Sequence, residues 1–250
     1  GEVEMASTAR WQRAQRYERD YWSSIATNIA AGSVSQLNWY QWRADALVGK
    51  LRDLGLQELT DGHARVVEVG SGPVGIVGFY PATERVAVDP LEPHYASNHT
   101  LTALRNPAVQ YRAGAAEQLP CESGRYDLAI IENCIDHVRD VDGAMRELQR
   151  VLTPAGVLYL TVNCRTRWGF VAHRTISNLR IDAGHPYTFT PPRVRRLLGK
   201  YGWEPLHFEV GSYATALRED LAGPGMRSRL KGLLGISEFL CSVVARRRGA

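Results

Sequence analysis

The stretch Val66-Val67-Glu68-Val69-Gly70-Ser71-Gly72-Pro73 decides how this chain is expected to fold. Valines around a single carboxylate predict a short buried strand, and the Gly-Ser-Gly that follows predicts a sharp turn. Because glycine has no Cβ, a ligand can lie against the main chain of such a turn. Pro73 suits the first turn of a helix, so the stretch predicts the strand, glycine turn and helix start of a Rossmann-type sheet, which binds nucleotide-like ligands there.

Glu68, rather than the glycines, indicates which ligand this turn holds. Gly70, Gly72 and Gly75 satisfy the dinucleotide pattern G-x-G-x-x-G, which is weak when it stands alone. A carboxylate two residues before the first glycine would repel a pyrophosphate and attract a cation. The run Glu-Val-Gly-Ser-Gly resembles the first motif of class I S-adenosylmethionine (SAM)-dependent methyltransferases, whose cofactor carries a sulfonium and an ammonium but no phosphate. The resemblance implies cofactor contacts for Glu68, Gly70, Ser71 and Gly72; the alternative is a structural turn with a chance glutamate.

The composition is that of an ordinary soluble globular protein. The 250 residues are 44% hydrophobic and 22% charged, which fits one large α/β domain with extra elements. A net charge of +4 is too small to indicate a nucleic-acid partner. No stretch approaches the roughly 20 apolar residues of a membrane span, and the acidic start lacks a signal-peptide pattern, so we predict a cytoplasmic protein. The four scattered cysteines give neither a zinc pattern nor a disulfide framework, and a homodimer is left open.

The chain divides into a helical start and an alternating α/β remainder. Residues 1–60 are predicted to form an N-terminal helical cap, with helices over 8–31 and 35–59. Tyr21 and Trp22 of this cap are candidates for contact with cofactor or substrate. Residues 61–250 are predicted to form the SAM-binding methyltransferase domain, with substrate inserts at 163–189 and 211–237.

Strands alternating with helices argue for a Rossmann-like, mostly parallel sheet with helices on both faces. The resemblance implies seven strands, of which the last is antiparallel and pairs beside strand five. The expected strands are 65–69, 85–89, 109–112, 126–132, 157–162, 203–210 and 238–245, and the helices among them are 73–80, 94–104, 140–152 and 191–201.

Two further segments point to an adenosine-bearing ligand. Asp89 ends the second strand, 17 residues after Gly72, where an acid can accept both ribose hydroxyls. NAD enzymes use the same device, and a turn aspartate before Pro90 is the structural alternative. The run 114–120 resembles the methyltransferase segment Gly-Asp-Ala-Glu-x-Leu-Pro, which holds the adenine. This chain has Ala115 where that family has Asp, so the carboxylate contact to the adenine amine is not expected from that position. Cofactor contacts are still implied for a short set of residues: Asp89, Pro90, Ala116 and Glu117.

The candidate catalytic residues follow strand four and precede the last helix. Tyr126–Val138 resembles the strand-four motif of the same family, which implies that Glu132 and Asn133 border the methionine end of SAM. His137 is a candidate general base for a hydroxyl acceptor, because a neutral imidazole can take its proton; the alternative is a packed histidine. His185 is a second base candidate on a predicted substrate loop beside Tyr187, a substrate-binding candidate.

The motifs together predict a SAM-dependent methyltransferase. The turn Leu148–Leu158 resembles the Arg-Val-Leu-Lys-Pro-Gly-Gly turn that marks the family before strand five. The predicted acceptor is a small molecule, with a hydroxyl of a sugar, natural product, quinone or lipid precursor as its methylated group. Methylation of nitrogen is the first alternative. An NAD(P)-dependent oxidoreductase and an inactive partner subunit of methyltransferase fold are the others, and no metal is predicted.

Overall fold

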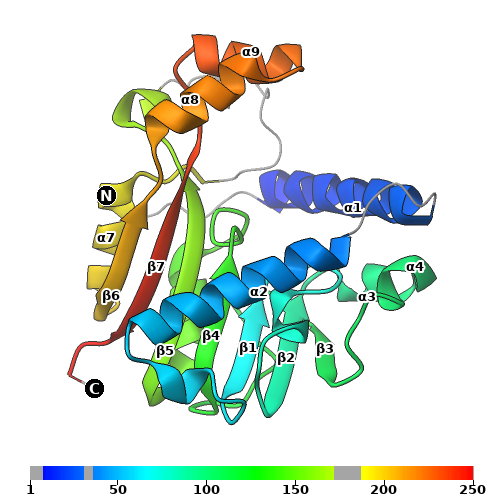
Figure 1. Ribbon diagram of the computed structural model, residues 1–250, viewed down its shortest axis with the longest axis vertical. Helices are drawn as coiled ribbons and strands as arrows, with labels where there is room; N and C mark the ends of the chain where they lie inside the picture. Colours follow the sequence, from blue (N-terminus) through cyan, green and yellow to red (C-terminus); the bar gives the residue numbers. More distant parts are fainter. Residues whose placement is uncertain (1–7, 31–35, 172–186, 250) are drawn as a thin grey trace.

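The computed structural model describes residues 8–30, 36–171 and 187–249. Within them a seven-stranded sheet has the order β3-β2-β1-β4-β5-β7-β6 (Figure 1). Every neighbouring pair is parallel except the two that involve β7, which runs antiparallel between β5 and β6. The strands are β1 Arg65–Val69, β2 Glu84–Asp89, β3 Val109–Ala113, β4 Tyr126–Glu132, β5 Leu152–Cys164, β6 Trp203–Val210 and β7 Phe239–Arg247.

Helices cover both faces of this sheet and one of its ends. Figure 1 shows α2 in front of the sheet, α1 above its upper edge, and α8 and α9 above β6 and β7. The helices are α1 Thr8–Ala30, α2 Gln36–Asp53, α3 Glu92–Ala96, α4 His99–Thr102, α5 Val141–Val151, α7 Pro191–Lys200, α8 Tyr213–Ala222 and α9 Met226–Leu233, with short 3-10 turns η1 Gln57–Leu59 and η2 Ile76–Gly78.

Alternating residues of the inner strands β1, β2, β4, β5 and β7 belong to two separate hydrophobic cores. Val66 belongs to the core that contains α2 residues such as Leu47 and Leu51. Val67 belongs to the core that contains α5 residues such as Met145. Because side chains alternate across a strand, this division places helices on both faces of the sheet. The predicted fold class, including the antiparallel last strand beside strand five, is confirmed.

Some predicted boundaries were wrong for identifiable reasons. Residues 73–80 do not form one helix, because Gly75 has a φ of 77° and only η2 follows it. Residues 94–104 are split between α3 and α4, and the side chain of Asn98 caps α4 by accepting N–H bonds from Thr100 and Leu101. The second helix ends at Asp53 rather than 59, since Gly55 adopts a φ of 76°.

The two predicted inserts differ in what the structure describes. The 211–237 segment contains α8 and α9, which pack against each other. Residues 172–186 of the other insert lie outside the described residues. Among the helices that are described, none has the length and apolar character to cross a bilayer.

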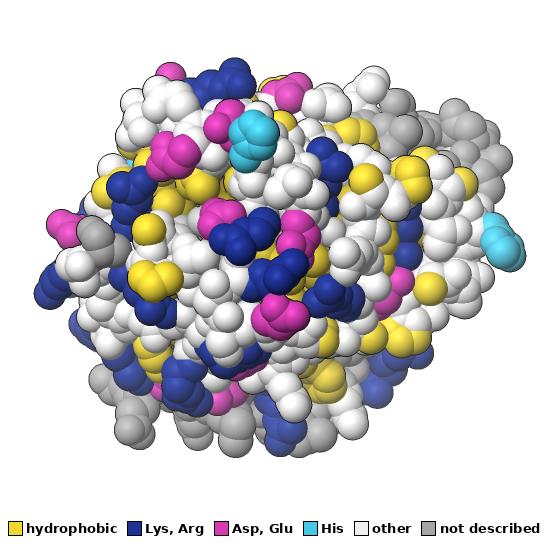
Figure 2. All heavy atoms as spheres, turned by 90° about the horizontal axis from the view of Figure 1, so that it is seen from below, with side chains coloured by type: hydrophobic (Ala, Val, Ile, Leu, Met, Phe, Trp, Pro, Cys, Tyr) yellow, Lys and Arg dark blue, Asp and Glu magenta, His cyan; other side chains and the backbone are white. Residues whose placement is uncertain are grey.

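The two ends of the sheet differ in character. The edge at which the parallel strands begin faces the viewer in Figure 2, where charged side chains of both signs gather. They include the ion pairs Arg65–Asp127, with nitrogen and oxygen 2.9 Å apart, and Arg125–Glu84, at 2.8 Å. These charges are paired with one another. Ligands of open α/β sheets bind at the opposite edge, where the parallel strands end.

Candidate active site

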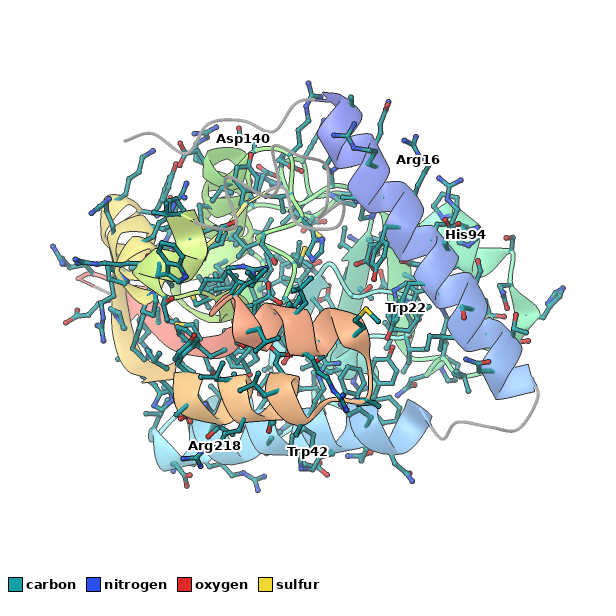
Figure 3. The ribbon with its side chains drawn as sticks, turned by 90° about the horizontal axis from the view of Figure 1, so that it is seen from above. Arg16, Trp22, Trp42, His94, Asp140 and Arg218 are labelled. Carbon is teal, nitrogen blue, oxygen red and sulfur yellow. The ribbon has the colours of Figure 1, made fainter. Side chains whose placement is uncertain are left out.

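A cavity of about 270 Å³ lies at the carboxyl ends of β1, β2 and β4. Its sheet wall is made of lining residues within 68–72, 89–91, 114–117 and 132–138. Its helical wall is made of lining residues within 11–22 of α1 and 39–43 of α2. Figure 3 views this edge from above, with α1 crossing it and Trp22 pointing from α1 toward the interior. The cavity therefore joins the predicted glycine turn to the predicted helical cap.

The glycine turn needs its glycines because other atoms approach it closely. Gly70 has a φ of 70°, and a Cβ there would lie 2.2 Å from the Sγ of Cys134. Gly72 has a φ of 62°, and a Cβ there would lie 3.3 Å from the indole of Trp22. Without those Cβ atoms the backbone of the turn is open to the cavity. The turn is thus a cradle that added side chains would fill, which fits a ligand lying on the main chain.

Glu68 lines the cavity and also holds the turn. Only 2% of it is exposed, and its Oε2 accepts a hydrogen bond of 2.8 Å from the N–H of Val77. Burial raises the pKa of the Glu68 carboxyl to about 7, with a smaller rise from the negative Glu132. A cationic ligand in the cavity would favour the ionised form and lower this pKa.

Asp89 holds the glycine turn and also lines the cavity. Its Oδ2 accepts from the N–H of Gly72 at 2.9 Å, and its Oδ1 accepts from the N–H of Leu91 at 2.8 Å. Burial raises the pKa of Asp89 to about 6. Both oxygens therefore hold the turn, yet each carboxylate oxygen has a second lone pair, and Asp89 and Pro90 line the cavity.

The 114–117 segment offers backbone more than side chains. The Oε1 of Glu117 accepts from the N–H of Arg139 at 2.5 Å and of Asp140 at 2.9 Å, so this carboxylate fixes the loop before α5. Ala115 has no polar side chain, and Ala116 lines the cavity beside it. The segment therefore contributes no carboxylate at position 115 for recognising a base.

Arg43 of α2 is the functional candidate that sequence reasoning missed. Its guanidinium forms an ion pair with Glu132 and lies 4.1 Å from the ring centre of Trp39. Both charged side chains are largely buried, at 18% and 10% exposed. The hydroxyl of Tyr40, one turn before, is buried and has no hydrogen-bond partner among the described residues. The sequence signal for this candidate was an arginine four residues after Trp39 and three after Tyr40, a spacing that places them on one helix face.

Beyond Glu132, the sheet wall turns sharply toward His137. Asn133 has a φ of 46°, which is uncommon for a residue other than glycine, and it lines the cavity. His137 lines the cavity too, with its side chain 16% exposed. Its Nε2 lies 3.8 Å from the Oδ2 of Asp136, which is longer than a hydrogen bond. The two neighbours approach because residues 135–137 form a turn, not the helix that would have separated them.

The remaining predicted residues fall in three different places. Tyr21 and Trp22 line the cavity from α1. Tyr187 does not line the cavity as the described residues define it; it is buried, and its hydroxyl donates to the carbonyl of Arg139 at 2.5 Å. His185 lies outside the described residues.

The cavity is predominantly acidic. The described lining residues include one guanidinium, that of Arg43, against five carboxylates: Glu18, Glu68, Asp89, Glu117 and Glu132. Such a wall disfavours a diphosphate and favours a ligand with positive charge. In the described part of the chain, no three His, Cys, Asp or Glu side chains gather as a metal ion would require.

Comparison with known proteins agrees with this geometry. Residues 67–160 match the family described as methyltransferase domain. The ubiquinone biosynthesis O-methyltransferase of Rhizobium rhizogenes is 28% identical over 108 residues, which are 41% of this chain and 42% of the relative. The chain thus matches less than half the length of that curated relative.

Solved structures share the fold. The [4+2]-cyclase SpnF aligns with a TM-score of 0.65 and 18% identity, over 100% of both chains. The geranyl diphosphate C-methyltransferase of Streptomyces coelicolor, in complex with Mg²⁺, geranyl diphosphate and S-adenosylhomocysteine, aligns with a TM-score of 0.56 and 13% identity, over 83% of this chain and 85% of that one. Identities this low show the fold alone.

The fold is Rossmann-like, and the acidic cavity lies at the edge of the sheet where such folds bind their ligands. Residues 67–160, the central part of the chain, match a methyltransferase domain. The prediction of the fold is confirmed, and the match to a methyltransferase domain agrees with the predicted class and cofactor.

Proposed function

We propose that this protein transfers a methyl group from SAM to a hydroxyl of a small-molecule acceptor. The acceptor would be a sugar, a natural product, a quinone or a lipid precursor. The observation that carries the proposal is the acidic sheet wall around a glycine cradle with no regular α-helix directly after it. A phosphate-binding turn places the phosphate at the N-terminus of such a helix, whereas a positively charged sulfonium is attracted by carboxylates.

The cofactor supplies an electrophilic methyl group on a positively charged sulfur. Glu68 and the turn at 70–72 would hold its methionine part, and Asp89 would accept its ribose hydroxyls. The backbone of Ala116 and Glu117 would border its base. The other cofactor candidates of the sheet wall are Ser71, Pro90, Glu132 and Asn133.

Arg43 and Tyr40 extend this assignment to the amino-acid end. The methionine part of SAM carries a carboxylate, and Arg43 is the only guanidinium among the described lining residues. The hydroxyl of Tyr40, which has no hydrogen-bond partner among the described residues, would provide a second donor beside it. Glu132, already paired with Arg43, would meet the ammonium of the same group. Fixed donors of this kind orient a ligand before any chemistry occurs.

His137 is proposed as the general base. It lines the cavity, and its Nε2 lies 3.8 Å from the Oδ2 of Asp136. The aromatic side chains of Tyr21 and Trp22 would exclude water and contact an apolar part of the acceptor. His185 remains a second candidate, and Tyr187, behind the cavity wall, would position residues 136–139. The similarity to an O-methyltransferase supports a hydroxyl acceptor over an amine.

A reaction without methyl transfer is the second candidate. The observation that favours it is the [4+2]-cyclase SpnF, which shares the fold over its whole length. One fold can host several chemistries, so only turnover separates the two functions.

Calorimetry and a product assay test the proposal. We expect SAM and S-adenosylhomocysteine to bind and NAD to show no binding under the same conditions. With a panel of hydroxyl acceptors, we expect S-adenosylhomocysteine to accumulate. Tight binding of NAD without binding of SAM would refute the class of cofactor. Methylation of amines alone would replace the hydroxyl acceptor with nitrogen.

A further inference from the structure

The inner stripe of α1 is polar in its middle. Trp11, Gln15, Glu18 and Trp22 line the cavity at spacings of four, three and four residues, which places them on one helix face. A buried stripe of a helix is usually apolar. The Oε1 of Gln15 is nevertheless buried and has no hydrogen-bond partner among the described residues. Because buried polar groups are normally paired, this oxygen points to a donor that a ligand supplies.

The position of Gln15 along α1 can be fixed from its neighbours. Trp22 lies against Gly72, and Gln15 is seven residues before it, about 10 Å nearer the start of the helix. Figure 3 shows Arg16, next to Gln15, on the side of the molecule that carries Asp140, while Trp22 and His94 lie farther along α1. The Asp140 loop is the one that Glu117 holds. Gln15 therefore lies toward the 114–117 end of the cavity.

At that end, residues 114–117 of the sheet wall offer no carboxylate at position 115 to recognise a base. Position 115 is alanine, and the Oε1 of Glu117 accepts from two backbone N–H groups of the loop before α5. Glu18 is the other polar residue of the α1 stripe. It is one turn nearer than Gln15 to Trp22, which lies against Gly72, so it lies closer to the glycine turn.

We propose that Gln15 recognises the adenine of the cofactor in place of the carboxylate missing at position 115. A primary amide can accept from the exocyclic amine of adenine and donate to a ring nitrogen, which is the pairing that glutamine makes with this base elsewhere. The indole of Trp11, one turn before on the same face, offers a surface on which the base can pack. This assignment rests on the proposed function, since it takes SAM as the cofactor.

Binding of two nucleosides measures the contact without any turnover. S-adenosylhomocysteine carries the exocyclic amine, and its analogue with unsubstituted purine in place of adenine carries only a hydrogen there, so the amide of Gln15 cannot turn over to regain the contact. We expect the wild-type protein to prefer the adenosine ligand by about tenfold or more. In Gln15→Leu we expect the preference to fall below about threefold, because the acceptor is gone. Gln15→Glu keeps an acceptor oxygen and should keep the preference.

Two controls separate recognition from folding. Gln12→Leu alters an exposed residue of the same helix and should leave both affinities unchanged. Ala115→Asp, added to Gln15→Leu, should restore the preference, because it returns a carboxylate to the sheet wall. An unchanged preference in Gln15→Leu, or a loss of the preference in Glu18→Gln instead, would overturn the assignment of Gln15 but leave the proposed function standing. A wild-type protein that binds neither nucleoside would overturn the proposed function as well.

Discussion

The two walls of the cavity are built in different ways. On the sheet wall the key groups are fixed by backbone: Glu68 and Asp89 accept N–H bonds from the loops they line, and Gly70 leaves room for Cys134. On the helical wall, the buried residues among the α1 side chains that the structure describes are the small Ala14 and Ala26, while Tyr21 is 49% exposed. The rigid sheet wall therefore determines the class of ligand, whereas the less buried helical wall can vary in the further groups of the ligand that it contacts.

The largest expected effect concerns chemistry on the sheet wall. His137→Gln should lower kcat by about 10²–10⁴-fold, the usual contribution of a general base. The dissociation constant for SAM should change less than about threefold, because no cofactor contact is assigned to His137. Steady-state kinetics and calorimetry measure the two quantities, and His99→Gln at an exposed position is the matched control. Full activity of His137→Gln would remove this residue as the base.

A second prediction tests how tightly the sheet wall is packed. Gly70→Ala should lower the free energy of unfolding by about 3 kcal/mol, since a positive φ and a 2.2 Å approach to Cys134 act together. Gly199→Ala is the control: no atom lies within 4 Å of its Cβ in α7, so alanine should be neutral or stabilise by about 0.5–1 kcal/mol. Chemical denaturation compares them, and equal stabilities would contradict the close approach.

The buried carboxyls predict how stability depends on pH. Burial raises the pKa of Glu68 to about 7 and of Asp89 to about 6, above their unfolded values. The folded protein therefore holds more protons than the unfolded chain between about pH 4 and pH 7. The ligand-free protein should lose stability as pH rises through this window, and Glu68→Gln should remove about 2 kcal/mol of that loss. Denaturation at pH 5 and pH 8 measures it; a steeper loss in Glu68→Gln would show the opposite sign.

The smallest prediction concerns the helical wall. Arg43→Leu should weaken binding of S-adenosylhomocysteine by about tenfold, because the carboxylate loses its charged donor. Binding of methylthioadenosine, which has no amino-acid group, should stay unchanged. Arg16→Leu, at an exposed position on α1, is the control for loss of charge. Equal weakening of both ligands would show that Arg43 supports the wall rather than the carboxylate.

Sequence predicted the part of the sheet wall between β1 and Asp89 well because its contacts are local. Strand β1, the glycine turn and Asp89 lie within 25 residues, and alternation within each strand fixes which side chains are buried. The limits of β4 and β6 were predicted to the residue. The turn predicted before strand five is instead part of β5. Its pairing register with β4 shifts between Tyr126 and Leu128, as at a β-bulge.

The helical wall was predicted less completely, because its contacts are long-range. Arg43 and Glu132 are 89 residues apart, and no helical spacing reveals that pair. Trp22 was chosen as an aromatic candidate, yet Gln15, on the same face, carries no sequence signal stronger than its spacing. The helix predicted at 73–80 was wrong because one positive φ, at Gly75, overrides the preference of Pro73 for a first helical turn.

In this proposal the acidic sheet wall selects a positively charged sulfur. The most direct test of this selection is the ratio of SAM to S-adenosylhomocysteine affinities at pH 6 and pH 8. The sulfonium lowers the pKa of the amine in SAM alone, so the wild-type ratio is compared with the ratio in Glu68→Gln, in which titration of the ligands is the same. We predict that the wild-type ratio rises with pH as Glu68 ionises, and that Glu68→Gln lacks this rise. A ratio in the wild-type protein that stays constant or falls between pH 6 and pH 8 would contradict the account.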